Sequence, residues 1–262
     1  MSNFLPKTKH KPRTSLGHYL LFLYGPPKMG KTTFASQIPD ALFLATEPGT
    51  AALEVFDLTI SSWSDFTTVV DELGRSPESK RYKAVVVDTV GILWDLLCAD
   101  ICKRRGWEHI SEGPFAEGYD MARTELNVAI SKLRKLEKLI AFVCHERRTD
   151  EIDDNGNRTG VTMITCDLPK SARKVFLGQS DFVVRAFLNE DNSRGLRLQP
   201  LRSKDEYIEC GCRGDITRPM PDTVPLSFKA FHKAFAKSFG ITKKAATKTP
   251  ATAEVTQPEA TA

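Results

Sequence analysis

Four short runs of consecutive apolar residues recur along the first 144 residues of the chain, at residues 19–24, 41–46, 82–88 and 139–144. Each run is almost continuously apolar and leads directly into glycine or polar residues. Strands that are buried on both faces have this pattern, because neither side of the sheet meets water. The runs therefore predict the strands of a parallel sheet.

Stretches with helical spacing lie between these runs. Residues 64–74 and 121–138 repeat apolar side chains every three or four positions, and residues 32–38 and 92–102 predict two further helices. Residues 103–120 have no such period and predict a loop. Because strands alternate with helices, the expected fold is α/β, with a mostly parallel central sheet flanked by helices.

The later part of the chain predicts a C-terminal region of β-hairpins. Residues 146–168 are polar and centre on the sequence Asp-Asn-Gly-Asn, a strong hairpin-turn signal. Residues 181–188 and 195–201 can pair across the polar segment between them. The other elements predicted here are a short helix, a strand and an amphipathic helix, at residues 169–177, 206–210 and 228–239.

The two ends of the chain differ from the rest in composition. Residues 1–18 carry several basic side chains and no long apolar stretch, which predicts a basic flexible arm. Residues 241–262 are rich in Ala, Thr, Pro and Lys and poor in large apolar side chains, which predicts a disordered tail. Residues 19–240 are then expected to form one folded domain.

Composition narrows the class of protein. Of the 262 residues, 41% are hydrophobic, which is enough for a sizeable core, and the net charge of +4 permits nucleic-acid binding without requiring it. The six cysteines are irregularly spaced and do not follow the pattern of a zinc site. No apolar run approaches the ~18 residues of a membrane span, and the N-terminus has no signal peptide. We therefore expect a cytoplasmic protein with no membrane contact.

The first predicted strand leads into a recognisable motif. Residues 25–32 read Gly-Pro-Pro-Lys-Met-Gly-Lys-Thr and match G-x-x-x-x-G-K-[ST], the phosphate-binding loop. Gly25 and Gly30 allow successive backbone amides to turn toward a phosphate. Lys31 would reach the β- and γ-phosphates of ATP, and the Thr32 hydroxyl would hold Mg²⁺. The residues expected to bind the nucleotide are Gly25, Pro26, Pro27, Lys28, Met29, Gly30, Lys31, Thr32 and Thr33.

Two carboxylates follow predicted strands. Asp88 closes an apolar run, and a carboxylate at that edge of a neighbouring strand can hold Mg²⁺ together with Thr32. Glu47 follows the strand that comes directly after the phosphate loop, where ligands gather in open α/β sheets. A carboxylate there can accept a proton from the water that attacks the γ-phosphate. An ordinary turn glutamate before Pro-Gly is the alternative for Glu47.

The order of phosphate loop, Glu47, Asp88 and His145 resembles the ATPase core of RecA-like recombinases, which are P-loop NTPases. In that family a Glu ends the second strand, an Asp the third and a polar γ-phosphate sensor the fourth. The resemblance covers residues 19–188 and implies catalytic roles for Lys31, Glu47 and His145. Bacterial recombinases carry Gln where His145 stands and have an N-terminal oligomerisation domain. The most similar subgroup is therefore the phage single-strand annealing proteins of the Sak type, which are minimal RecA cores with a His at that place.

The same resemblance implies that two loops contact single-stranded DNA, here residues 103–120 and 146–168. Their cations can meet phosphates, and aromatic residues such as Trp107 and Phe115 can stack on bases. Solvated charges above aromatics packed under a loop are the alternative. The cations expected to contact DNA are Lys103, Arg104, Arg105, Arg147, Arg148, Lys170, Arg173 and Lys174.

Three hypotheses for function follow. The first is a DNA-stimulated ATPase that binds and anneals single-stranded DNA in homologous recombination, as a ring or filament of identical subunits. Such a phage-encoded protein would act in the bacterial cytoplasm, with a single-stranded-DNA-binding protein as a partner. The second is a small-molecule kinase, with residues 146–168 as its lid. The third is a module in which ATP orders the DNA loops with little hydrolysis. Arg202, Lys204 and Arg213 are candidates for a cation that reaches the ATP of a neighbouring subunit.

Overall fold

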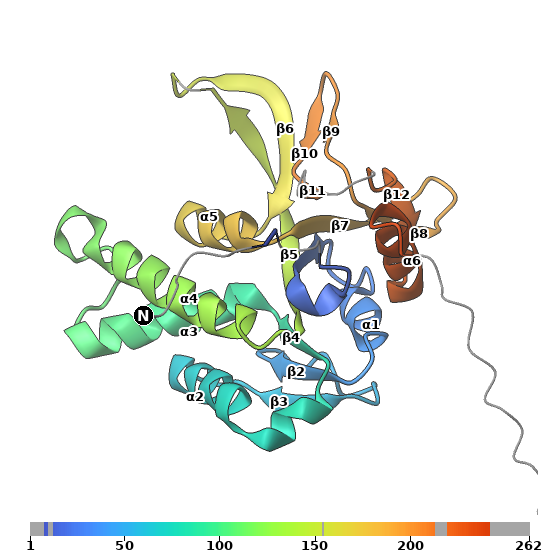
Figure 1. Ribbon diagram of the computed structural model, residues 1–262. Helices are drawn as coiled ribbons and strands as arrows, with labels where there is room; N and C mark the ends of the chain where they lie inside the picture. Colours follow the sequence, from blue (N-terminus) through green and yellow to red (C-terminus); the bar gives the residue numbers. More distant parts are fainter. Residues whose placement is uncertain (1–7, 10–12, 154, 213–218, 242–262) are drawn as a thin grey trace, which may run out of the picture.

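In the computed structural model the described residues are 8–9, 13–153, 155–212 and 219–241. Most of the predicted N-terminal arm, and all of the predicted tail after residue 241, lie outside them. The described chain forms a central sheet with helices on both faces and two projections (Figure 1). This arrangement confirms the predicted α/β fold with a mostly parallel sheet.

Six strands run parallel to one another at the centre of the sheet. In the order along the sheet β3-β2-β4-β5-β1-β7, every neighbouring pair is parallel. Antiparallel strands continue the sheet beyond β7. The parallel strands are β1 (Leu20–Gly25), β2 (Ala41–Ala45), β3 (Phe56–Thr59), β4 (Ala84–Asp88), β5 (Leu139–Ile152) and β7 (Phe182–Leu188). The antiparallel strands are β8 (Arg194–Arg197), β11 (Gly211–Cys212) and β12 (Thr223–Pro225).

The register of the parallel strands places the ends of β1, β2 and β4 near the same level, within two residues of His145 in β5. Gly25 at the end of β1 lies opposite His145 in β5, and Ala45 at the end of β2 lies opposite Asp88 in β4. Because β5 is inserted between β1 and β4, His145 lies between the phosphate loop and Asp88. All the predicted nucleotide-site residues therefore converge on the carboxyl edge of the sheet.

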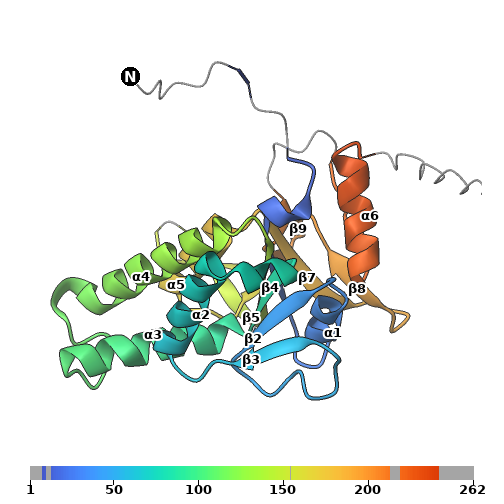
Figure 2. The same cartoon turned by 60° about the horizontal axis from the view of Figure 1, so that its bottom comes forward.

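Helices cover both faces of the sheet, which explains why its central strands are continuously apolar (Figure 2). Leu20, Phe22 and Tyr24 of β1 pack in the core that includes the larger helical layer, whereas Leu21 and Leu23 pack on the opposite side. The larger layer contains α2 (Trp63–Arg75), α3 (Val90–Arg105), α4 (Glu117–Arg134) and α5 (Lys170–Gln179). The other layer contains α1 (Lys31–Ser36) and α6 (Phe228–Ser238). The 3-10 helices are η1 (Leu16–His18), η2 (Pro77–Arg81) and η3 (Pro114–Ala116).

One projection is a β-sheet that continues from β5. The prediction that this strand ends at His145 was wrong, because β5 runs on to Ile152 and pairs with β6 (Arg158–Cys166). The predicted hairpin across the Asp-Asn-Gly-Asn segment is confirmed by this antiparallel pairing. The strands β9 (Leu201–Arg202) and β10 (Glu206–Ile208) widen the projection. We call residues 146–166 the β5–β6 arm (Figure 1).

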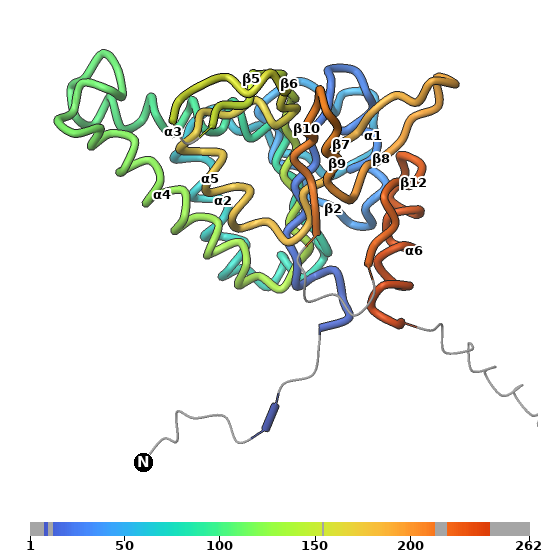
Figure 3. Tube along the Cα trace, turned by 90° about the horizontal axis from the view of Figure 1, so that it is seen from above, coloured from blue at the N-terminus to red at the C-terminus, as the bar shows by residue number. Residues whose placement is uncertain are grey.

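The other projection is the helical hairpin of α3 and α4 (Figure 3). Residues 103–120 were predicted as a loop, but α3 continues to Arg105 and α4 already begins at Glu117. Gly106, with φ of 70°, ends α3 in the left-handed conformation that glycine tolerates. The helix predicted at residues 121–138 is therefore shifted toward the N-terminus. No helix of the described chain is long and apolar enough to cross a membrane.

Candidate nucleotide site

The phosphate loop connects β1 to α1 and depends on its two glycines. Gly30 has φ of 96°, a conformation that side-chain-bearing residues rarely adopt. A Cβ atom at Gly25 would lie 2.5 Å from the carbonyl oxygen of Ala186 in β7. The first glycine therefore allows close packing against the neighbouring strand, and the second allows the turn of the loop into α1.

The side chain of Lys31 is buried under this loop, with 6% of its surface exposed. Its ammonium donates hydrogen bonds to the carbonyl oxygens of Gly25 (2.9 Å) and Pro26 (2.8 Å). It also lies 3.4 Å from Nδ1 of His145. Burial lowers the pKa of Lys31, although nearby carboxylates, chiefly Asp88, oppose this shift. The loop thus holds a desolvated cation whose neighbours in direct contact are not carboxylates, and a phosphate is a suitable counter-ion for it.

Thr32 and Asp88 meet at the edge between α1 and β4. The Thr32 hydroxyl donates a hydrogen bond of 2.7 Å to Oδ2 of Asp88. Burial is the main cause that raises the pKa of Asp88, which is 7% exposed, while the bond from Thr32 opposes the shift. Hydroxyl and carboxylate oxygens are ligands that suit Mg²⁺, which usually takes few protein ligands and keeps its remaining positions for phosphate and water. The pair therefore fits the predicted metal role.

Glu47 and His145 complete the cluster. Oε1 of Glu47 accepts a hydrogen bond of 2.9 Å from the Thr89 hydroxyl and lies 3.7 Å from Nε2 of His145. Thr46 and Thr89 are joined by two further hydrogen bonds, which fix the end of β2 to the residue after β4. The structure therefore brings Glu47 and His145 into contact and places them beside Lys31.

Thr89 was missed as a site residue by the sequence reasoning. The only sequence feature that pointed to it was its position directly after Asp88, and a threonine at such a position can have many other roles. Its partnership with Glu47 depends on the pairing of β2 with β4, which brings together residues 42 positions apart. Among the described residues, no group of three or more His, Cys, Asp or Glu side chains could hold a metal by itself.

Comparison with known proteins assigns a family. A family model described as an AAA domain, AAA_24, matches residues 18–206 of this chain. The chain belongs to this AAA-domain family. Family membership and the phosphate-loop geometry together support a P-loop nucleotide-binding protein. A solved structure entitled "Crystal structure of the RadB recombinase" is similar at a TM-score of 0.43 and 15% sequence identity, over 72% of this chain and 84% of that chain. No curated protein matches this chain.

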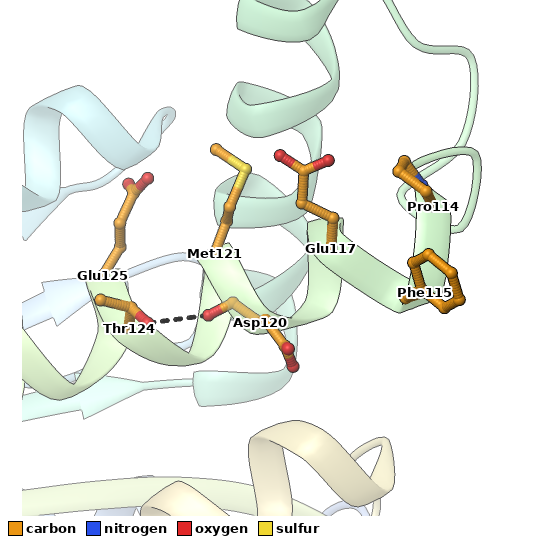
Figure 4. A pocket seen from close by; sticks show the side chains of 7 residues that line it. All are labelled: Pro114, Phe115, Glu117, Asp120, Met121, Thr124 and Glu125. Carbon is orange, nitrogen blue, oxygen red and sulfur yellow. Dashed lines mark hydrogen bonds between the residues drawn. The ribbon is translucent and has the colours of Figure 1, made fainter.

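The cations predicted to bind DNA lie on the two projections of this AAA-domain protein and on α5. On the helical hairpin, Arg104 pairs with Asp100 (2.8 Å) and Glu125 (2.7 Å), and Arg105 pairs with Glu117. A pocket on α4 beside these residues is lined by Glu117, Asp120 and Glu125 (Figure 4). Carboxylates therefore neutralise two of the three predicted cations here, and only Lys103 has no recorded partner among the described residues.

The second predicted group spans the β5–β6 arm and α5. Arg148 lies 3.6 Å from Glu206, and Arg173 lies 3.9 Å from Glu209. Arg147, Lys170 and Lys174 have no recorded acidic partner in the described part of the chain, and Nε of Arg147 is buried without a hydrogen bond. Of the candidates for a cation directed at a neighbouring subunit, Arg202 pairs with Glu151 at 2.8 Å and Arg213 lies outside the described residues.

Proposed function

We propose that this chain binds and hydrolyses ATP with Mg²⁺ and uses the bound nucleotide to control binding and annealing of single-stranded DNA. One observation carries the proposal. Lys31, the Thr32–Asp88 pair, Glu47 and His145 converge from neighbouring strands, and His145 leads without a break into the β5–β6 arm. The strand β5 thus carries both a residue of the proposed nucleotide site and one side of the exposed arm.

In the proposed hydrolysis of the γ-phosphate, each residue of the site has its own role. Lys31 would hold the β- and γ-phosphates, and Thr32 with Asp88 would hold Mg²⁺, which would neutralise phosphate charge. Glu47 accepts the proton of the attacking water, since its carboxylate is oriented by the Thr89 hydroxyl at 2.9 Å. The contact between His145 and both Lys31 and Glu47 suits a residue that senses the γ-phosphate.

The link to the arm runs through the residue after His145. Glu146 forms a buried ion pair with Arg185 of β7, with Nε and Oε2 2.8 Å apart. This pair anchors the base of the arm to β7, the strand beside β1. A movement of His145 would then change the position of the arm relative to this anchored base. A ligand can change the position of the arm only if ATP and ADP interact differently with this junction.

Single-stranded DNA is the proposed second ligand of the arm. Arg147 on the arm, with Lys170 and Lys174 on α5, are predicted cations that have no acidic partner among the described residues, and α5 lies beside the base of the arm (Figure 1). Annealing within a homo-oligomer is proposed because the strand-end motifs resemble those of Sak-type annealing proteins. The kinase alternative is not favoured, because residues 146–168 are largely two paired strands, and two of the three arginines in this segment are bound to acids.

Fluorescence anisotropy of a labelled oligonucleotide tests the proposal. Wild-type protein should bind DNA more tightly with a non-hydrolysable ATP analogue than with ADP, and His145→Ala should remove this difference while ATP binding persists. ATP hydrolysis should rise when single-stranded DNA is added. His232→Ala, which removes an exposed histidine of α6 that is not part of the proposed site, is the matched control and should behave as wild type. Equal DNA affinity in both nucleotide states of the wild type would contradict the coupling.

A further inference from the structure

A second cation lies at the phosphate loop, in addition to Lys31. A Cβ atom built on Gly30 would lie 3.0 Å from Nη1 of Arg194 and 3.9 Å from its Cζ. The guanidinium of Arg194 is thus in the immediate neighbourhood of the loop residue that precedes Lys31. Lys31 is buried beneath the loop, whereas Arg194 is an exposed residue at its rim.

The backbone of Arg194 is held firmly in this position. Arg194 is the first residue of β8 and pairs with Leu188 of β7, which in turn belongs to the strand beside β1. The connecting turn is closed by a hydrogen bond of 2.8 Å from the amide of Asn189 to the carbonyl of Ser193. The carbonyl of Arg194 accepts a bond of 3.0 Å from the amide of Leu226. The hairpin therefore holds the base of this side chain close to the phosphate loop.

The charge of Arg194 is not neutralised by any residue that the structure describes. No carboxylate of the described residues lies within ion-pair distance of its guanidinium, and no side-chain hydrogen bond is recorded for it there. Its neighbour Arg197, by contrast, stacks over the ring of Phe187 at 5.7 Å. An unpaired guanidinium beside a phosphate loop is suited to bind phosphate, because its planar set of donors matches phosphate oxygens.

We propose that Arg194 binds the phosphate chain of the nucleotide held by the phosphate loop of the same subunit. The inference rests on the proposed nucleotide site and adds a residue to it. The cation comes from the β7–β8 hairpin rather than from a neighbouring molecule, so it is present in a single chain. Lys31 and Arg194 then contact the phosphates from the buried side and from the rim of the loop.

Isothermal titration with ATP and with ADP, both in the presence of Mg²⁺, tests this role. Arg194→Ala should weaken the binding of ATP by about tenfold to a hundredfold, the effect of losing hydrogen bonds to a charged group. Arg194→Lys keeps the charge and should recover part of the affinity. Arg75→Ala, which removes an exposed arginine at the end of α2, is the matched control and should bind as wild type does. Thermal melting of each variant checks that it is folded.

The outcomes separate this inference from the proposed function. A loss for ATP alone assigns the contact to the γ-phosphate, and an equal loss for ADP assigns it to the phosphates nearer the ribose; both support the proposal. Wild-type affinity in a folded Arg194→Ala protein would overturn it, as would equal losses in the Ala and Lys variants. If the wild type itself bound neither nucleotide, the proposed function would fail as well. If Lys31→Ala abolished binding and Arg194→Ala did not, only the role of Arg194 would fall.

Discussion

The carboxyl edge of the sheet and the β5–β6 arm differ in the burial and in the partners of their charged side chains. At the edge, Lys31 and Asp88 are buried and are hydrogen-bonded to backbone carbonyls and to a hydroxyl rather than to each other. On the arm, Arg148, Arg158 and Glu151 are exposed or near solvent and lie in ion pairs with Glu206, Asp150 and Arg202.

This contrast shows where charge is available to a ligand. A buried ion with neutral partners carries an unfavourable desolvation energy that a charged ligand can offset. An exposed ion pair contributes little to stability, and a ligand must compete with the existing partner. The edge is therefore organised for binding, whereas on the arm and on α5 the cations available to a ligand are those without an acidic partner among the described residues.

The largest effect is expected for Lys31→Ala. The substitution removes two charge-assisted hydrogen bonds from Lys31 to the phosphates, each worth about 1.5–3 kcal/mol. ATP affinity, measured by titration, should therefore fall roughly 10²- to 10⁴-fold. Because burial lowers the pKa of Lys31, its charged form is unfavourable in the folded protein without nucleotide. Lys31→Met should thus melt at the same temperature as wild type or a higher one. A folded Lys31→Ala protein that binds ATP normally would contradict the site.

Glu47→Gln should slow ATP hydrolysis by about 10²- to 10⁴-fold, because an amide cannot accept the proton of the attacking water. Single-turnover hydrolysis measures the effect, and ATP affinity should remain close to that of the wild type. Thr89→Val removes the hydroxyl that orients Glu47 and should give a smaller loss in the same assay. Normal turnover in Glu47→Gln would make this residue an ordinary turn glutamate.

A more moderate effect is expected from the raised pKa of Asp88. Its protonated form is favoured in the folded protein, so this stability is present below the ordinary pKa of 3.8 and is lost as the pH rises through the raised value. Binding of Mg²⁺ needs the carboxylate, and the contribution of Mg²⁺ to ATP affinity should therefore weaken on acidification before pH 3.8 is reached.

Asp88→Asn tests this explanation against a general effect of acid. At neutral pH the variant should lose about tenfold in Mg²⁺-dependent ATP affinity, comparable to one hydrogen bond to a charged group. Its melting temperature without ligand should be unchanged or raised, because no buried carboxylate remains. Titrations with and without Mg²⁺ over a pH series measure both quantities, and an identical pH dependence in wild type and variant would contradict the role of Asp88.

The same contrast explains how far the sequence could predict this molecule. The edge was predictable because buried parallel strands have a continuous apolar pattern and the phosphate loop has fixed spacing. The strand β3 was missed because its four residues are exposed and give no such pattern. The continuation of β5 past His145 was also missed, because the arm leaves the core and its residues become polar.

Ion pairs and close approaches depend on tertiary contacts that local sequence does not encode. Arg104 was expected to face DNA, yet Glu125, which lies 21 positions away, contacts it across the helical hairpin. Arg194 gave no signal at all, because a single arginine after a turn is common on protein surfaces. A basic cluster in the sequence therefore indicates candidates, and the structure decides which of them have acidic neighbours.

The smallest effects concern two adjacent arginines of the arm. Arg148 is paired with Glu206, so Arg148→Ala should weaken binding of single-stranded DNA by less than about threefold, as expected for an exposed charge shared with an acid. Arg147 has no acidic partner among the described residues, and Arg147→Ala should weaken binding by about tenfold. The dependence of log affinity on log salt should become shallower by about 0.7 for Arg147→Ala and remain unchanged for Arg148→Ala, since each phosphate contact on a single strand releases counter-ion.

Glu206→Gln sharpens the comparison, because releasing Arg148 from its acid should raise DNA affinity, and the added Arg148→Ala substitution should cancel this gain. Anisotropy titrations at several salt concentrations measure all four variants; equal losses for the two arginines would show that pairing with an acid does not decide which cations of the arm meet DNA.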